Sequence, residues 1–125
     1  MTDEKKKILI VDDDVVMRRS LTRLLSQEKK YDIEEAADGT VAEKMINEFA
    51  PDLIILDIKM PQKDGYEVLW SMKEQMKTQH IKVIGISGFS GDTGESIMTV
   101  LGADAFFEKP FEVDELKEKI EELIG

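Results

Sequence analysis

The sequence predicts an α/β protein in which five parallel strands form a sheet between two layers of helices. Short apolar runs alternate with amphipathic segments along the whole chain. Two of these runs, residues 8–11 and 53–56, are continuously apolar, which is typical of strands that are covered on both faces. The chain has 125 residues, of which 42% are apolar, so we expect one domain over residues 1–125 and no output domain.

Five apolar runs predict the strands. They are rich in Ile, Leu, Val and Phe, and they are too short to be buried helices. The runs are residues 8–11, 33–37, 53–58, 83–86 and 105–107, and the second is the weakest. Pro51 stands just before the third run, where its missing N–H removes no hydrogen bond from the sheet.

Five stripes of apolar residues at helical spacing predict five helices, each with one face that packs on the sheet. The stripes are Met17, Leu21, Leu24 and Leu25; Ala42, Met45, Ile46 and Phe49; Leu69, Met72 and Met76; Ile97, Val100 and Leu101; and Leu116, Ile120, Leu123 and Ile124. The sequence Thr40-Val41-Ala42-Glu43 has the pattern of a capping box that starts the second helix. Gly102 is placed to end the fourth helix.

Composition excludes several classes of function. The net charge of −10 repels phosphate backbones and anionic lipid, so we expect no direct nucleic-acid partner and no membrane insertion. The absence of cysteine excludes thiol catalysis, Cys-ligated zinc, iron–sulfur clusters and disulfides. The apolar run behind the charged start is too short for a signal peptide or a membrane span, so we expect a cytoplasmic protein.

Polar residues follow the predicted strands at the edge where ligands bind in open α/β sheets. The first strand ends in Asp12-Asp13-Asp14, the third in Asp57 and the fourth in Ser87, and the fifth runs into Lys109-Pro110. Taken singly, each residue has an ordinary structural interpretation, such as a turn, an N-cap or a surface charge. Their coincidence at four strand ends indicates a site.

The residue types at this edge predict metal-assisted phosphoryl transfer. Crowded carboxylates repel one another unless a proton or a cation neutralises them. A cluster with only oxygen ligands suits a hard cation, Mg²⁺ or Mn²⁺. One aspartate oxygen can then act as a nucleophile toward phosphorus and give an aspartyl phosphate. Lys109 supplies charge to the phosphoryl oxygens, and Ser87 supplies a hydroxyl donor.

Several sequence blocks share their order and spacing with a known family, and together they cover essentially the whole chain. They are Ile8-Leu9-Ile10-Val11-Asp12-Asp13, Asp57-Ile58-Lys59-Met60-Pro61, Asp64-Gly65, Val83-Ile84-Gly85-Ile86-Ser87-Gly88 and Gly102-Ala103-Asp104-Ala105-Phe106-Phe107-Glu108-Lys109-Pro110-Phe111. The chain thereby resembles the receiver (response-regulator) domain of two-component signalling, and it is similar to single-domain chemotaxis response regulators. The resemblance implies a flavodoxin-like, doubly wound sheet with the strand order 2-1-3-4-5.

The resemblance also implies the chemistry of the site. Asp57 is the implied phospho-acceptor, which takes its phosphoryl group from a phosphohistidine on a sensor histidine kinase or a histidine phosphotransfer protein. Asp12 and Asp13 hold Mg²⁺ together with Asp57 and the backbone carbonyl of Lys59. The domain is then no conventional enzyme, because it catalyses only its own phosphotransfer and autodephosphorylation at Asp57.

A conformational switch is the next implication of the resemblance. Ser87 closes onto the phosphoryl oxygen, Lys109 pairs with it, and the aromatic Phe106 turns inward once Ser87 moves. The face formed by helix 4, strand 5 and helix 5 then carries the signal to a downstream protein. The peptide bond before Pro110 is expected to be cis.

Two residues flank the implied phosphoryl site and give a hypothesis about lifetime. Lys59 lies two residues beyond Asp57, and Phe89 lies two residues beyond Ser87. We expect the stem of Lys59 and the ring of Phe89 to restrict the access of water and to prolong the phosphorylated state.

Three alternative functions share parts of this pattern. A phosphatase of the haloacid-dehalogenase type would use an aspartyl phosphate, but it needs a D-x-D nucleophile after the first strand and an inserted cap. A flavodoxin-like cofactor binder would need a hydroxyl- and glycine-rich phosphate loop where this chain has three aspartates. The third alternative is a receiver-like module that signals by binding alone, without phosphorylation.

Overall fold

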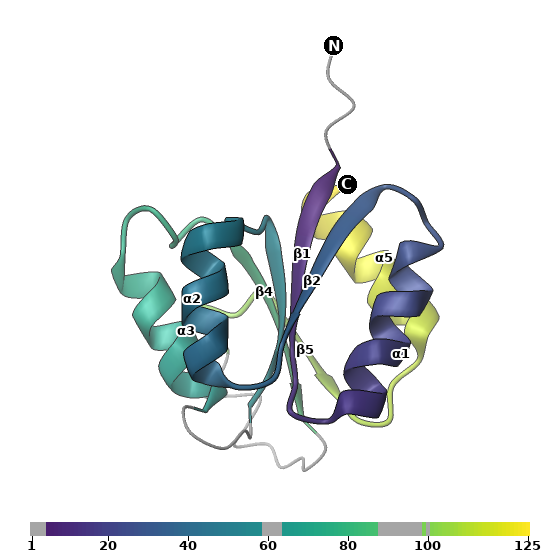
Figure 1. Cartoon of the computed structure of the whole chain (residues 1–125), viewed down its shortest axis with the longest axis horizontal. Coiled ribbons are helices and arrows are strands. Elements are labelled where there is room, and N and C mark those ends of the chain that lie inside the picture. The colour runs from purple at the N-terminus through teal and green to yellow at the C-terminus, as the bar shows by residue number, and fades with distance from the viewer. Residues whose placement is uncertain (1–4, 59–63, 88–98, 100) are drawn as a thin grey trace.

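The chain folds into a three-layer α/β sandwich, seen in Figure 1 as a computed structural model that describes residues 5–58, 64–87, 99 and 101–125. Within these residues, five parallel strands form one sheet in the order β2-β1-β3-β4-β5. Both the α/β class and the strand order are therefore confirmed. The described part contains four helices rather than the five expected. The expected helix around Ile97, Val100 and Leu101 falls largely on residues 88–98 and 100, which lie outside the described residues.

Up to β4 the described strands and helices alternate as the apolar pattern predicts, and between β4 and β5 lie residues 88–98 and 100, which the structure does not describe. The strands are β1 (Lys6–Val11), β2 (Tyr31–Ala36), β3 (Leu53–Asp57), β4 (Lys82–Ser87) and β5 (Ala105–Glu108). The helices are α1 (Val15–Ser26), α2 (Gly39–Phe49), α3 (Gly65–Glu74) and α5 (Val113–Ile124). Each strand overlaps its predicted run, and each end agrees with the prediction to within two residues.

Two apolar cores lie on opposite faces of the sheet, because successive side chains of a strand point to opposite sides. Helices α2 and α3 cover one face, and α1 and α5 cover the other (Figure 1). Leu9 and Val11 of β1 face α2 and α3, whereas Ile8 and Ile10 face α1 and α5. All four side chains are fully buried. Burial of such a side chain stabilises the fold by about 1.5–3 kcal/mol, which explains why residues 8–11 of β1 and 53–56 of β3 are continuously apolar.

Two local predictions are wrong. Helix α2 starts at Gly39, and its N-cap is Asp38, whose carboxylate accepts a hydrogen bond of 2.9 Å from the N–H of Val41. Thr40 is therefore already inside the helix and is not the cap of a capping box. Met76, which we placed on the apolar face of the third helix, is 86% exposed. Helix α3 ends at Glu74, and the chain beyond it leaves the helical path because Gln75 is extended.

The helix that Gly102 is predicted to end lies largely outside the described residues. Gly102 has φ of +104°, a left-handed conformation that suits a glycine ending a helix. Among the described helices, none combines the length and the apolar character that crossing a membrane requires.

Candidate functional site

The register of the sheet brings the predicted site residues to one edge. Val11 pairs with Leu56, so Asp12 and Asp57 follow side by side at the ends of β1 and β3. Asp57 pairs with Ile86, which places Ser87 next along β4. The N–H of Lys109, just after β5, donates a hydrogen bond of 2.7 Å to the carbonyl of Ser87. The convergence predicted from four strand ends is present.

Three carboxylates form an acidic cluster at this edge. Oxygens of Asp12, Asp13 and Asp57 all lie within 4.8 Å of one another. The residue Asp12 is 0% exposed and Asp57 is 5% exposed, whereas Asp13 is exposed. Two of the three carboxylates are thus buried, and the third, Asp13, is in contact with solvent. An ion from water can reach the cluster from the side of Asp13.

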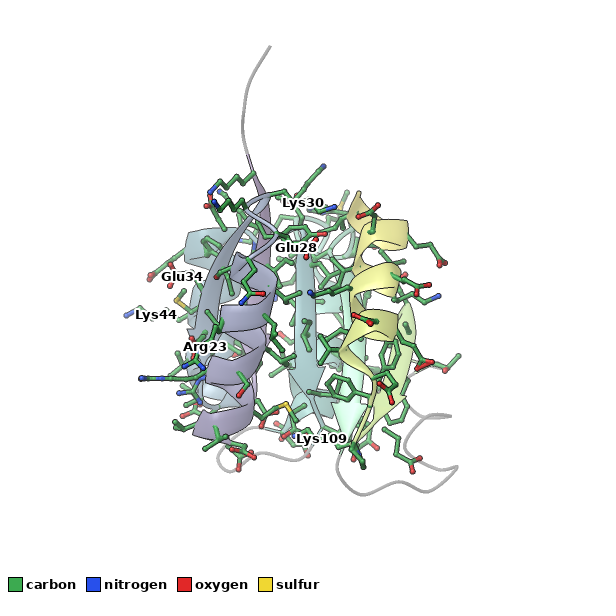
Figure 2. The ribbon with its side chains drawn as sticks, turned by 90° about the vertical axis from the view of Figure 1, so that its right-hand side faces the viewer. Arg23, Glu28, Lys30, Glu34, Lys44 and Lys109 are labelled. Carbon is green, nitrogen blue, oxygen red and sulfur yellow. The ribbon has the colours of Figure 1, made fainter. Side chains whose placement is uncertain are left out.

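One ammonium group, that of Lys109, lies among these carboxylates at the edge of the sheet (Figure 2). The Nζ atom of Lys109 is 2.8 Å from Oδ2 of Asp12 and 3.7 Å from Oδ2 of Asp57. Burial by itself would lower the pKa of Lys109, but its hydrogen bond to Asp12 and the charges of Asp57, Asp12 and Asp14 outweigh burial and raise that pKa above 10.5. Lys109 is therefore protonated at neutral pH.

The charge balance of the cluster fits a divalent cation. One ammonium against three carboxylates leaves two negative charges in a largely buried space. The candidate ligands are all oxygen atoms, which Mg²⁺ prefers. On donor chemistry and on charge, Asp12, Asp13 and Asp57 fit this ion.

The third aspartate after β1 has a different role from the other two. Asp14 is the N-cap of α1, where its Oδ1 accepts hydrogen bonds from the N–H groups of Val16 at 3.0 Å and Met17 at 3.2 Å. Its own N–H donates to Oδ1 of Asp12 at 2.9 Å. Asp14 therefore starts the helix and holds the carboxylate of Asp12 in place.

A close backbone contact holds the other end of the cluster. A Cβ atom on Gly65 would lie 2.3 Å from the carbonyl oxygen of Asp57 and 2.8 Å from Cα of Ile58. Only glycine allows the first turn of α3 to approach Asp57 this closely. Asp64 caps the same helix by accepting a hydrogen bond from the N–H of Glu67 at 3.0 Å. The pair Asp64-Gly65 thus fixes the backbone of Asp57.

The remaining predicted residues divide into described and undescribed ones. Ser87 is 2% exposed. Phe106 pairs with Gly85 of β4 and packs, partly buried, against the core beneath α2 and α3. The peptide bond between Lys109 and Pro110 is cis, as the resemblance implies. Two further residues, Lys59 and Phe89, lie outside the described residues, so their roles stay predictions.

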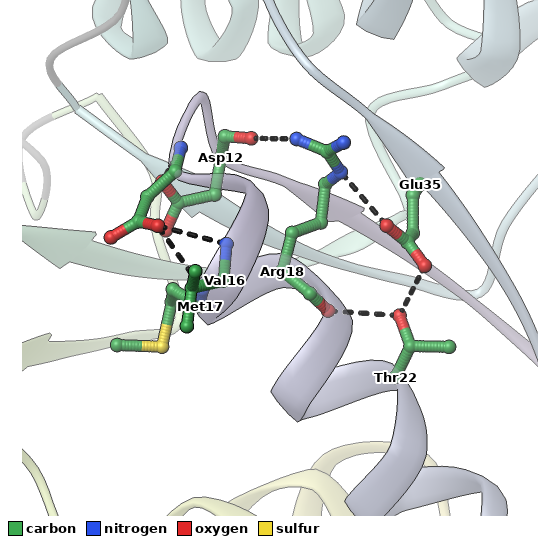
Figure 3. Close-up of polar contacts among 7 residues, drawn as sticks. Asp12, Val16, Met17, Arg18, Thr22 and Glu35 are labelled. Atoms are coloured by element: carbon green, nitrogen blue, oxygen red, sulfur yellow. Dashed lines mark hydrogen bonds and ion pairs between the residues drawn. The ribbon is translucent and has the colours of Figure 1, made fainter.

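A polar network that the sequence did not predict lies behind the cluster, and Figure 3 shows it. Arg18 of α1 is only 8% exposed, and it contacts both the backbone of Asp12 and the carboxylate of Glu35. A signal was present, because Arg18 stands three and seven residues before Leu21 and Leu25 and so shares the buried face of α1.

The fold and the site together define a class of protein: a doubly wound α/β domain with an acidic cluster and one lysine at the carboxyl edge of its parallel sheet. Residues 8–121 match the response regulator receiver domain family, and the chain belongs to that family. This family functions in two-component signalling, with histidine kinases and downstream effectors as partners.

Individual relatives agree with this assignment. The chain is 34% identical over 111 residues to response regulator Rre1 of Synechocystis sp., covering 87% of this chain but 47% of Rre1. It is 30% identical over 105 residues to the polar-differentiation response regulator DivK of Brucella anthropi, covering 84% of this chain and 85% of DivK. A CheY-like receiver domain structure from Methanospirillum hungatei has a TM-score of 0.87 at 32% identity and covers 94% and 92% of the two chains. Against several curated relatives, Rre1 included, the chain spans less than half of the relative's length.

Proposed function

We propose that this domain accepts a phosphoryl group on Asp57 from a phosphohistidine of a histidine kinase or a histidine phosphotransfer protein, and signals by protein contact. The observation that carries the proposal is the placement of Asp57 within 4.8 Å of two further carboxylates and 3.7 Å from the ammonium of Lys109. A nucleophile, ligands for a cation and a cationic partner for phosphate are then all at one edge of the sheet.

The cation is part of the proposal. Asp12, Asp13 and Asp57 would hold it, and the backbone carbonyl of Lys59 is the fourth protein ligand that the family resemblance implies. When bound, Mg²⁺ or Mn²⁺ would neutralise the carboxylates and the phosphoryl oxygens, so that an anionic donor can approach an anionic nucleophile.

The residues of the chain then carry out an in-line displacement. An oxygen of Asp57 attacks phosphorus, the P–N bond to the donor imidazole breaks, and its electron pair returns to the imidazole nitrogen. Lys109 is close enough to Asp57 to pair with a phosphoryl oxygen, and Ser87 offers its hydroxyl as a donor. Attack of water on the phosphorus later breaks the new P–O bond and restores the Asp57 carboxylate.

The signal would leave through β5 and its neighbours. Phe106 lies opposite Gly85, and Glu108 lies opposite Ser87, so the switch residues occupy adjacent strands of one ladder. A shift of Ser87 toward the phosphoryl group would therefore displace the residues of β5 that pair with β4. We propose that Phe106 responds by turning inward and that the face of helix 4, β5 and α5 binds the downstream protein.

Intact mass spectrometry tests the chemistry. The wild-type chain is incubated with acetyl phosphate and Mg²⁺, beside Asp57→Asn and the matched control Asp32→Asn, an exposed residue of β2. The proposal predicts one phosphoryl adduct on the wild type and the control, none on Asp57→Asn, and none with a chelator. An unmodified wild-type chain would favour a receiver that acts by binding alone.

The proposed role of Lys59 and Phe89 has its own test. Phe89→Ala and Lys59→Asn are each phosphorylated and freed of acetyl phosphate, and the decay of the adduct is followed with time. We expect faster decay in both variants, because water reaches the phosphoryl group more easily. Unchanged decay in both would refute the lifetime hypothesis.

A further inference from the structure

Arg18 lies buried behind the acidic cluster. Arg18 is the only basic residue among the polar and charged residues that are buried in the described part of the chain. Its Nε donates a hydrogen bond of 2.8 Å to Oε1 of Glu35, and its Nη1 donates another of 2.8 Å to the backbone carbonyl of Asp12 (Figure 3). A single planar guanidinium therefore joins α1, the strand β2 and the loop that begins the cluster.

The carbonyl of Asp12 needs such a partner because the sheet does not supply one. Asp12 follows the last paired residue of β1, Val11. Its N–H still donates to the carbonyl of Ala36 at 3.1 Å. Its own carbonyl lies beyond the ladder, and a buried carbonyl without a hydrogen bond would cost about 1–3 kcal/mol.

Holding this carbonyl also orients the next aspartate. The C=O of Asp12 and the N–H of Asp13 belong to one planar peptide unit. Once Arg18 fixes the oxygen of that unit, it fixes the direction in which the chain enters Asp13. The side chain of Asp13 is exposed, whereas that of the buried Asp12 contacts the N–H of Asp14 and the ammonium of Lys109.

The rest of the network holds Arg18 and balances its charge. Glu35 accepts from the guanidinium through Oε1, and its Oε2 lies 2.8 Å from the hydroxyl of Thr22. The same hydroxyl lies 3.0 Å from the backbone carbonyl of Arg18. Because Glu35 neutralises the guanidinium, Arg18 can donate its hydrogen bond without adding a net positive charge beside a cation site.

We propose that Arg18, held by Glu35 and Thr22, is a positioning residue for the cation site, which sets the peptide between Asp12 and Asp13 in the orientation that binds the metal. This inference rests on the proposed function. It predicts an effect whose sign is opposite to that of simple electrostatics. Removal of a positive charge near carboxylates should by itself strengthen cation binding, whereas loss of positioning should weaken it.

The test measures Mn²⁺ binding to the unphosphorylated full chain, by the electron paramagnetic resonance signal of free Mn²⁺. The variants are Arg18→Met, which removes charge and donors, and Arg18→Lys, which keeps the charge but cannot reach both partners with one planar group. Arg19→Met, an exposed neighbour on α1, is the control for charge. Circular dichroism and urea unfolding identify the variants that retain the fold.

We expect both Arg18 variants to bind Mn²⁺ about tenfold more weakly, and Arg19→Met to bind within about twofold of the wild type. Phosphorylation by acetyl phosphate should then need more Mg²⁺ in the Arg18 variants but reach a near wild-type rate at saturation. Unchanged or tighter Mn²⁺ binding by a folded Arg18 variant would overturn the inference. If Arg18→Met does not fold, the Mn²⁺ affinity of Arg18→Lys alone tests the inference. A wild-type chain that binds no Mn²⁺ would instead refute the proposed function, and the inference with it.

Discussion

Lys109→Met provides a demanding test of the charge balance in the acidic cluster. At 2.8 Å, the attraction between the ammonium and Asp12 is about 6 kcal/mol at an effective dielectric constant of 20. The net loss in Lys109→Met is smaller than this attraction, because methionine has no charge that must be desolvated on folding. The variant leaves two buried carboxylates, Asp12 and Asp57, without the ammonium that pairs with them. In the absence of metal we therefore expect Lys109→Met to lose about 3–5 kcal/mol of unfolding free energy.

Urea unfolding with and without Mg²⁺ measures this loss. A divalent cation would neutralise the carboxylates that Lys109 serves, so Mg²⁺ should stabilise Lys109→Met more than the wild type and narrow the gap between them. Lys119→Met is the control, because its ion pair with Glu122 is on the surface and should be worth less than about 1 kcal/mol. The reasoning is refuted if the two variants lose equal stability, or if Mg²⁺ leaves the gap unchanged.

Three further outcomes follow from the contacts described. Because its folded-state pKa is raised above 10.5, Lys109 contributes stability that is complete below that pH and is lost as pH rises through the folded value. The stability gap between the wild type and Lys109→Met should therefore be flat from about pH 7 to 9 and shrink only at higher pH, and urea titrations that show it shrinking below pH 9 would contradict this. Gly65→Ala should cost about 1–3 kcal/mol and slow phosphorylation by acetyl phosphate, since its methyl group meets the carbonyl of Asp57; an unaltered rate and midpoint would show that α3 can move away freely. Asp38→Ala should lower the free energy of unfolding by about 1 kcal/mol and Thr40→Ala by much less, as measured by thermal unfolding. A larger loss for Thr40→Ala would indicate that Thr40 is the N-cap of a capping box after all.

Strands were predictable because both of their faces are buried. The run Ile8-Leu9-Ile10-Val11 must be apolar at every position when helices cover both sides of β1. The weak second run has a physical explanation as well. Strand β2 is at the edge of the sheet, and exposed positions such as Asp32 dilute its apolar signal. The convergence of Asp12, Asp57 and Lys109 also followed from the sequence, because parallel strands end at a common edge.

Contacts between distant side chains were not predictable in the same way. Arg18 and Glu35 are separated by 17 positions, and nothing in their local patterns states that α1 packs beside the end of β2. Helix ends were uncertain for a different reason. Asp38 and Thr40 are both good N-cap residues two positions apart, and only the extended backbone of Asp38 decides between them. Met76 has the spacing of the apolar stripe of α3, but the helix ends at Glu74, so spacing alone did not reveal that Met76 is outside the helix.

The central claim is that Asp57 is the residue that receives the phosphoryl group, and chemical trapping tests it most directly. Borohydride reduces an aspartyl phosphate to homoserine, so peptide sequencing of the phosphorylated and reduced chain locates the modified residue. The account predicts homoserine at position 57, in an amount that follows the phosphoryl adduct and falls to zero when Mg²⁺ is chelated. Homoserine at Asp12 or Asp13, or an adduct that yields none at position 57, would contradict it.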